Sequence, residues 1–320
     1  MKEIKKVLIG LVSIIVLLVV ADWAVGTWSE KMYFKSKYSI FRRQIYCLNE
    51  SDDDILIFGS SRAAHHYIPS ILSDSLGMSC YNAGSDGECI YYHYTLFASM
   101  IERGARPKFV VLDVIPQDIY ESTSSSFRLE DAIERLSPHY DEFASVKELY
   151  SLLGWKERIK MCSRAYRYNS KLVQTIRCNY IPTYDELGFE GLDRILDKAH
   201  VRKKKQGDEK IIDENKIAYL QRFIQLAQIN NIPIVIVESP RYIRYETGLS
   251  DLVREISNKS NIPYYNFSDC PDICTPELFN DESHLNINGA TLYSMKIADL
   301  LKEPQIRNYA PNMIQKRKES

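Results

Sequence analysis

The 320-residue sequence contains no C-x-x-C pair, although it has seven cysteines. This absence argues against a zinc knuckle or a thioredoxin-type redox site, and we find no other motif for a metal or a cofactor. If the chain is exported, a disulfide between Cys270 and Cys274 can close a small loop, with buried free thiols as the alternative. The seven cysteines are spread along the whole chain: Cys47, Cys80, Cys89, Cys162, Cys178, Cys270 and Cys274.

The sequence also lacks an excess of charge of either sign. The 41 Lys and Arg residues nearly balance the 42 Asp and Glu residues, so the formal net charge is −1. A chain without a strong basic field gives no electrostatic reason to expect binding to nucleic acid. The basic run at residues 202–205 is short and typical of a solvated loop. With no internal repeat, the length and composition fit one globular domain that can carry an insertion.

The N-terminal segment has little charge and is strongly apolar. Lys2, Lys5 and Lys6 precede an uncharged run at residues 7–21. We predict that residues 1–26 form a transmembrane signal anchor, with the lysines in the cytoplasm and the remainder of the chain outside it. A signal peptide cleaved after Ala21 is an open alternative, and a buried core helix is a third. Residues 27–52 are predicted to be a juxtamembrane connector, near lipid headgroups or simply solvated.

Short apolar runs alternate with helical patterns over most of the chain. This order predicts an α/β fold with three layers (α/β/α) and a parallel, five-stranded, flavodoxin-like sheet, in a domain at residues 53–301. The predicted strands are residues 55–58, 78–81, 108–113, 232–237 and 262–267. The predicted helices between and after them are residues 65–76, 90–103, 213–230, 248–260 and 287–301.

One long stretch, at about residues 116–210, contains no apolar strand pattern. We interpret it as a helical insertion that caps the site, because insertions in α/β enzymes shape substrate pockets. Its predicted helices lie near residues 129–136, 145–153 and 161–176. The tail at residues 302–320 is polar, and we expect it to be loosely ordered.

The stretch from Asp53 to Arg62, which reads DDILIFGSSR, ends a predicted strand at a small polar turn. Ser61 is therefore expected at the carboxyl end of a central strand, where open α/β sheets bind ligands. It is also expected at the start of the next helix, whose free N–H groups can stabilise an oxyanion.

A second candidate site precedes the last predicted helix, in the run NDESHLNINGA at residues 280–290. Asp281 and His284 are three residues apart, so the carboxylate can accept a hydrogen bond from the imidazole and fix its tautomer. A histidine oriented in this way can take the proton of a serine hydroxyl, which is otherwise a weak nucleophile.

Taken together, FGSSR, NAGSDG at residues 82–87 and DESHLNINGA resemble the blocks of the SGNH (GDSL-like) hydrolase superfamily. The resemblance implies that Ser61 is the nucleophile, His284 the base and Asp281 the acid that orients it. It also implies an oxyanion hole formed by Ser61 and Gly84, with no metal and no cofactor. The GSSR form looks like a membrane-anchored subgroup that is linked to acyl transfer or acyl removal on cell-envelope polymers.

The sequence departs from this family in its third block, Gly-x-Asn-Asp, for which residues 113–118 read DVIPQD.

The expected function is an extracytoplasmic, membrane-anchored serine esterase or O-acyltransferase. Its expected substrate is an acylated envelope polysaccharide or a peptidoglycan-type polymer, and a membrane acyltransferase is a possible partner. The alternative is a non-catalytic module that binds polysaccharide or assists such an acyltransferase.

Other residues beside these blocks are given structural roles. We expect Arg62 on a helix surface and His65 and His66 facing solvent. The aromatic group at residues 91–94 (YYHY) is predicted to pack in the core.

Overall fold

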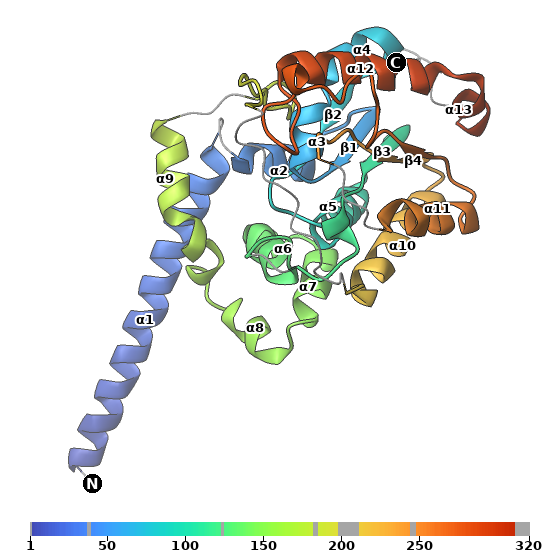
Figure 1. Cartoon of the computed structure of the whole chain (residues 1–320). Helices are drawn as coiled ribbons and strands as arrows, with labels where there is room; N and C mark the ends of the chain where they lie inside the picture. The colour runs from blue at the N-terminus through green and yellow to red at the C-terminus, as the bar shows by residue number, and fades with distance from the viewer. Residues whose placement is uncertain are drawn as a thin grey trace, which may run out of the picture. The chain divides into compact units, whose positions relative to one another are not determined.

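The computed structural model of the chain describes residues 2–36, 40–122, 125–181, 185–197, 211–243 and 248–310. The chain forms two compact units (Figure 1), which we describe separately. Unit 1 comprises Met1–Arg42 and Ile133–Thr183, and unit 2 comprises Arg43–Ala132 and Tyr184–Ser320. The basic run at residues 202–205 and the tail residues 311–320 lie outside the described residues.

Unit 2 is built on a five-stranded sheet whose strands are all parallel, in the order β2-β1-β3-β4-β5. This is the flavodoxin-like order, so the predicted fold class is confirmed. Every residue of β1, β3 and β4 is buried, which explains why these strands read as nearly continuous apolar runs. The strands are β1 (Ile55–Gly59), β2 (Cys80–Asn82), β3 (Phe109–Asp113), β4 (Ile234–Glu238) and β5 (Tyr264–Asn266).

Helices cover both faces of this sheet, which gives the three predicted layers (Figure 1). One face carries α3 (Ser61–His66), α4 (Pro69–Leu76), α12 (Ile287–Lys302) and α13 (Pro304–Tyr309). The other face carries α5 (Ile90–Arg103), α10 (Glu214–Ile229) and α11 (Leu249–Lys259). Short 3-10 turns, η1 (Pro116–Asp118) and η5 (Pro276–Leu278), follow β3 and precede α12. Two further helices, α2 (Ile40–Asn49) and α6 (Leu129–Leu136), carry the chain between the units.

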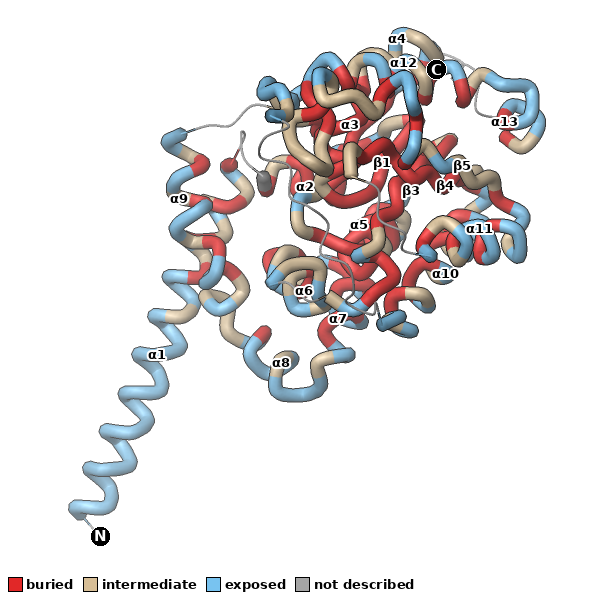
Figure 2. Tube along the Cα trace, viewed as in Figure 1, coloured by how far each residue is buried: buried red, intermediate tan, exposed pale blue. Residues whose placement is uncertain are grey.

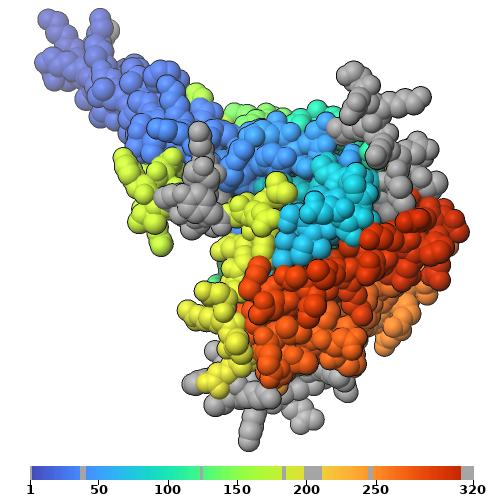
Figure 3. Space-filling model, turned by 90° about the horizontal axis from the view of Figure 1, so that it is seen from above, coloured from blue at the N-terminus to red at the C-terminus, as the bar shows by residue number. Residues whose placement is uncertain are grey.

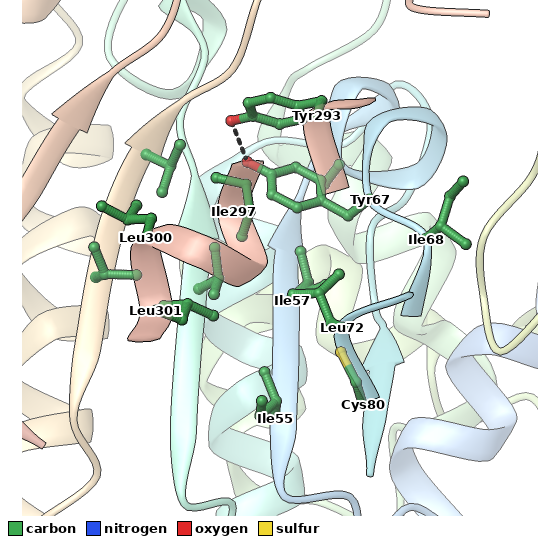
Figure 4. Close-up of a cluster of buried hydrophobic side chains, with 14 of the residues drawn as sticks. Ile55, Ile57, Tyr67, Ile68, Leu72, Cys80, Tyr293, Ile297, Leu300 and Leu301 are labelled. Atoms are coloured by element: carbon green, nitrogen blue, oxygen red, sulfur yellow. Dashed lines mark hydrogen bonds between the residues drawn. The ribbon is translucent and has the colours of Figure 1, made fainter. Parts of the chain in front are cut away.

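Alternate residues of β1 pack on opposite faces of the sheet. Ile55 and Ile57 belong to a buried cluster under α4 and α12 (Figure 4). On the other face the Phe58 ring lies 5.4 Å from the ring centres of both Phe97 and Phe223. Burying side chains of this size contributes about 1.5–3 kcal/mol each to stability, so both helical layers are held firmly against the central strand.

The predicted helix at residues 65–76 is wrong in one respect, because two helices occupy this region. Tyr67 and Ile68 are extended, and Pro69 opens α4. The residue before a proline is disfavoured in the helical region. The Ile68 N–H is instead satisfied by Ser294 Oγ at 2.8 Å, and the Tyr67 hydroxyl lies 3.2 Å from that of Tyr293 (Figure 4). The two extended residues between α3 and α4 are therefore hydrogen-bonded to α12.

Unit 1 combines the N-terminal helix α1 (Lys2–Lys35) with part of the predicted insertion. The predicted helices at residues 129–136 and 145–153 are present, whereas η3 and α9 replace the one predicted at residues 161–176. Tyr33 of α1 is fully buried, with ring centres at 5.2 Å from Phe41 and 5.9 Å from Tyr168. The elements of the insertion are η2 (Ser137–His139), α7 (Ala144–Ser151), α8 (Trp155–Lys160), η3 (Tyr166–Lys171) and α9 (Leu172–Tyr180).

Helix α1 is long and apolar enough to cross a membrane, and its apolar N-terminal part is exposed (Figure 2). Its length and composition fit a membrane anchor or a signal sequence. It also continues as far as Lys35 and so includes the first part of the predicted connector. A cleavage after Ala21 would leave the packed part of α1 intact. The third interpretation, a buried core helix, is wrong, because none of the apolar window is buried.

The described part of the C-terminal tail is more ordered than predicted. Helix α13 begins at Pro304, and Ile306 within it is almost completely buried in the cluster under α12. The burial of Ile306 in this cluster holds α13 in place. The prediction rested on the polar composition of the whole tail, which does not reveal one buried apolar residue.

Candidate active site

Ser61 opens helix α3, two residues after β1 ends at Gly59. Gly59 has φ +149°, and a Cβ there would lie 2.6 Å from the carbonyl oxygen of Asp113 and 2.8 Å from Cβ of Ala63. Only glycine fits such a turn. The turn therefore places Ser61 at the carboxyl edge of the sheet, as the sequence predicted.

The structure brings Ser61, His284 and Asp281 into one chain of hydrogen bonds. His284 Nε2 lies 2.8 Å from Ser61 Oγ, although the two residues are 223 positions apart. His284 Nδ1 lies 2.9 Å from Asp281 Oδ2 and 3.0 Å from Oδ1. A serine, an imidazole and a carboxylate in this order form the geometry of a nucleophile with its general base.

The carboxylate of Asp281 determines which nitrogen of His284 carries the proton. Burial raises the pKa of Asp281, but the bonds from the His284 ring, the Ser283 N–H and Asn280 outweigh it and hold that pKa well below its usual range. An ionised carboxylate only accepts hydrogen bonds. The proton of His284 therefore lies on Nδ1, and its Nε2 is free to accept the hydroxyl hydrogen of Ser61.

A further hydrogen bond links the end of α3 to the residue that follows His284. His66 Nε2 accepts a hydrogen bond from the N–H of Leu285 at 3.1 Å. His66 is fully buried, and its burial together with the nearby His284 lowers its pKa well below the usual value, so the ring stays neutral and can accept. The prediction that His66 faces solvent is wrong: it fixes the backbone next to His284.

The segment that carries His284 is held at the start of α12. The Asn286 side chain caps this helix by accepting the N–H groups of Asn288 and Gly289, both at 3.1 Å, and donates to the carbonyl of Glu277 at 2.8 Å. A side chain at Gly289 would collide with the carbonyl oxygen of Leu278. The N-I-N-G part of the motif is thus explained by helix capping and close packing.

Gly84 follows β2 and lies against α3, where a Cβ would meet the backbone nitrogen of Ala64 at 2.5 Å. Its N–H donates to Asn82 Oδ1 at 2.9 Å, and the Asn82 amide donates to the carbonyls of Ala63 and Tyr67. An oxyanion would have to displace this bond before Gly84 could serve as a donor. Asn82, which the sequence analysis did not single out, ties the end of β2 to α3.

Gly87 lies three residues further along the same loop, with φ +74°. Neither its N–H nor that of Ser61 makes a hydrogen bond to any residue that the structure describes. After β3, by contrast, Val114, Ile115 and Pro116 have no side-chain donor. The Ser61 N–H is thus a backbone donor at the sheet edge without an acceptor among the described residues, and the first side-chain amide after β3 is that of Gln117.

Arg62 is buried, contrary to the prediction of a helix-surface residue. Its guanidinium donates to the carbonyl of Val114 at 2.8 Å and to that of Ser239 at 3.1 Å. Asp113 accepts from the Ser239 N–H at 3.1 Å, and its burial raises its pKa to about 6 although Arg62 lowers it. The arginine of the GSSR run thus joins the ends of β1, β3 and β4.

His65 lies beside His284, with ring centres 5.4 Å apart, and it is buried where the prediction had it facing solvent. Its Nδ1 donates to the carbonyl of Glu190 at 2.7 Å, and its Nε2 lies 3.5 Å from Asp86 Oδ1. Burial lowers the pKa of His65, but Asp86 and Glu190 raise it, and the net direction is upward. Neither Asp86 nor Glu190 was predicted as a site residue.

Residues 185–197 run along the surface beside α3 and the His284 segment (Figure 3). The Glu190 N–H donates to the carbonyl of Ala64, and the Ile287 N–H donates to that of Leu192. Arg43 completes this cluster through Gly84 O and Glu190 Oε2, both at 2.9 Å. The end of the predicted insertion, residues 185–197, is therefore part of the wall of the site, and this part of the insertion lies where a cap was expected.

The site is open to solvent, since the His284 and Asp281 side chains are 24% and 48% exposed. Tyr91, Tyr92 and His93 are buried, as predicted for core aromatics. All seven cysteines are free thiols, and Cys162 alone is exposed. Within the described residues, no group of His, Cys, Asp and Glu side chains could hold a metal ion.

No protein-family model matches the chain, and no curated protein sequence is similar to it. Among solved structures, it matches the crystal structure of a putative acylhydrolase from Bacteroides fragilis NCTC 9343, at 11% identity. The match covers 79% of this chain and 88% of the other, with a TM-score of 0.38. A similarity this low carries no argument about function, which therefore depends on the geometry of the site.

Proposed function

We propose that the protein is a serine ester hydrolase or O-acyltransferase of the SGNH type. One observation carries the proposal: Ser61 Oγ, His284 Nε2 and the Asp281 carboxylate form a continuous chain of hydrogen bonds at the carboxyl edge of a parallel sheet. The geometry meets the requirement that the nucleophile lies within reach of a base that a third group orients.

In the proposed reaction, His284 Nε2 takes the proton of Ser61 Oγ as that oxygen attacks the carbonyl carbon of an ester. The ester C–O bond then breaks, and His284 returns the proton to the departing alkoxide oxygen, which leaves an acyl group on Ser61. Water or a sugar hydroxyl next attacks this acyl group and gives its own proton to His284. Collapse of the second tetrahedral intermediate restores the Ser61 hydroxyl and releases the acid or the new ester.

The developing oxyanion needs donors, and backbone N–H groups are the candidates. The N–H groups of Ser61 and Gly87 have no acceptor among the described residues, whereas that of Gly84 is bonded to Asn82. We therefore assign the first donor to the Ser61 N–H and retain Gly84, which lies against α3, as the second, once its N–H leaves Asn82. Loss of a third, side-chain donor typically costs about 10²–10³ in rate, so we expect slow turnover of simple esters.

Two features support a location at the membrane and a substrate in the cell envelope. Lysines precede the apolar part of α1, which favours a cytoplasmic N-terminus and a catalytic unit outside the cytoplasm. The resemblance of GSSR to the envelope-acylating subgroup favours acyl, in particular acetyl, esters of envelope glycans. A membrane acyltransferase would be a fitting partner, as the source of the acyl group.

Hydrolysis of an activated acetyl ester by the full chain in detergent tests the proposal. We expect Ser61→Ala and His284→Ala to lower kcat by at least about 10³-fold, with wild-type thermal unfolding. A serine-directed fluorophosphonate should label the wild type on Ser61 and leave Ser61→Ala unlabelled. Equal turnover by wild type and Ser61→Ala would end this assignment.

A non-catalytic glycan-binding or assembly module is the second candidate. It is favoured by the segment after β3, which has no side-chain donor at residues 114–116, and by the engaged N–H of Gly84. Under this alternative, glycan binding survives Ser61→Ala and no acyl or phosphonyl group can be trapped on Ser61. The fluorophosphonate experiment therefore separates the two candidates.

A further inference from the structure

The C-terminal half of α1 fixes the position of one turn of the insertion within unit 1. The Asp22 side chain accepts a hydrogen bond from Ser163 Oγ, one from the N–H of Arg164 at 2.9 Å and one from the N–H of Ala165 at 3.1 Å. A Cβ on Gly26 would lie 2.6 Å from Cβ of Arg164, so only glycine allows this approach. The turn at residues 163–165 therefore lies beside residues 22–26 of α1.

Residues 22–26 are also where the apolar part of α1 ends. From Lys6 to Asp22 the helix rises about 24 Å, at about 1.5 Å per residue, which is close to the thickness of a bilayer's hydrocarbon core. Trp23 is 61% exposed, and tryptophan is enriched at the level of the lipid headgroups. If α1 spans a membrane, the turn at residues 163–165 lies at the membrane surface.

Helix α8 immediately precedes this turn and exposes an apolar stripe. Leu152, Trp155 and Ile159 are 51%, 66% and 57% exposed. Trp155 and Ile159 are four residues apart and lie on one face of α8, and Leu152 lies three residues before the helix begins. Figure 1 shows α8 on the side of unit 1 toward which the N-terminal half of α1 runs, and Figure 2 shows how exposed it is. Exposed apolar residues grouped in this way mark an interaction surface.

The charge of α8 indicates what this surface meets. The helix carries Lys156, Arg158 and Lys160, and its one acidic residue, Glu157, is paired with Lys160. Basic residues next to tryptophan and aliphatic side chains are typical of segments that lie in the membrane interface, where they meet anionic headgroups.

The exposed apolar residues at the end of α9, Tyr180 and Ile181, do not belong to this surface. The Asn179 side chain near the end of α9 donates to the carbonyl of Met32 at 3.0 Å. Met32 lies ten residues beyond Asp22, or about 15 Å further along α1. The end of α9 is therefore well above the level at which α1 would leave the bilayer.

We propose that Leu152, Trp155 and Ile159 insert into the headgroup region of the leaflet from which α1 emerges, while the basic residues of α8 contact anionic lipid. Unit 1 is then attached to the membrane at two places, by α1 and by α8. This inference goes beyond the proposed catalytic function and is independent of it. It does rest on α1 spanning the membrane.

The three tryptophans of the chain, Trp23, Trp28 and Trp155, allow a direct test with the full chain. The variant Trp23→Phe/Trp28→Phe leaves Trp155 as the only emitter. After reconstitution into protein-free vesicles of phosphatidylcholine and phosphatidylglycerol, we expect its fluorescence to be quenched by lipids brominated near the headgroup end of the acyl chains. Bromination near the chain ends should quench it less, and Leu152→Asp/Ile159→Asp should weaken the quenching.

The matched variant Trp28→Phe/Trp155→Phe leaves Trp23 and reports the insertion of α1. Quenching of Trp23 without quenching of Trp155 would overturn the proposal and point to a protein partner for this face. Absence of quenching in both variants would overturn it together with the anchor role of α1. A fluorophore on Cys162, the exposed thiol beside the turn, gives a second measurement: its emission should shift to shorter wavelength on reconstitution, and an unchanged emission would contradict the proposal.

Discussion

The sheet edge of unit 2 and helix α8 of unit 1 differ in which side chains they bury. In unit 2 the polar side chains at the sheet edge are buried and bonded, as Arg62, His66 and Asn82 show. In unit 1 large apolar side chains such as Trp155 and Ile159 remain exposed. A buried polar side chain is stable only when its hydrogen bonds are made, and an exposed apolar group needs a partner or a lipid to cover it.

This difference separates two kinds of functional residue. Those of unit 2 act through fixed distances to atoms of the same unit, so their substitution should change catalysis or folding. The exposed residues of α8 are proposed to act on lipid outside the chain, so their substitution should leave both nearly unchanged. The following predictions test this contrast, from the largest expected effect to the smallest.

Asp281→Asn should lower kcat by up to about 10⁴-fold, because an amide can hold the wrong tautomer of the catalytic imidazole. Steady-state hydrolysis of an activated ester measures this. Asp272→Asn is the matched control, since Asp272 is largely exposed and lies 3.9 Å from Lys296. If Asp281→Asn keeps a kcat close to that of Asp272→Asn, Asp281 does not orient His284 during the reaction.

Arg62→Ala should destabilise unit 2 by about 3–5 kcal/mol, the range for removing one partner of a buried charge network. The carbonyls of Val114 and Ser239 would lose their donor, and the buried Asp113 would lose its nearby cation. Arg158→Ala, on the exposed face of α8, should change the free energy of unfolding by less than about 0.5 kcal/mol. Urea unfolding of both variants measures the two free energies. If both variants change the free energy of unfolding by the same small amount, Arg62 does not hold the ends of β3 and β4 together.

His66→Phe should leave the Leu285 N–H without its acceptor and destabilise the protein by about 1–3 kcal/mol. Because that N–H is next to His284, labelling of Ser61 by a fluorophosphonate should also slow down. His66→Asn retains a side-chain acceptor and should recover part of the labelling rate. If both variants react as fast as wild type, the bond does not position His284.

His93→Phe tests a pH dependence that originates far from the site. Burial lowers the pKa of His93 from 6.5 to about 3, and neither ring nitrogen has a hydrogen-bond partner among the residues that the structure describes. Below pH 6.5 His93 is protonated in the unfolded chain but stays neutral in the folded protein. The free energy of unfolding therefore falls as the pH falls.

Between pH 8 and pH 5 this histidine should cost the wild type about 2 kcal/mol, at 1.36 kcal/mol per pH unit below pH 6.5. His93→Phe should remove that part of the loss, which urea unfolding at both pH values would measure. The same pH dependence in variant and wild type would show that the folded protein accommodates a protonated His93.

The sheet was predictable because buried parallel strands leave a strong local signal. Runs such as ILIF and IVIV are apolar without interruption, and the turn after β1 requires a glycine. The helical pattern of residues 65–76 does not show that Tyr67 and Ile68 are extended, because their hydrogen bonds go to α12, more than 200 residues away. The side chains of Arg62 and His66 were placed in solvent because nothing near them in the sequence shows what they contact.

The sequence by itself determined the five strands, the position of Ser61 at the end of the first and the three-residue spacing of Asp281 and His284. Each of these depends on patterns within about ten residues. Only the tertiary structure decided that Ser61 meets His284, that the N–H of Gly84 already has an acceptor and that the turn at residues 163–165 lies beside Asp22. These are contacts between segments far apart in the chain, which are fixed when α4 packs against α12 and α1 against the insertion.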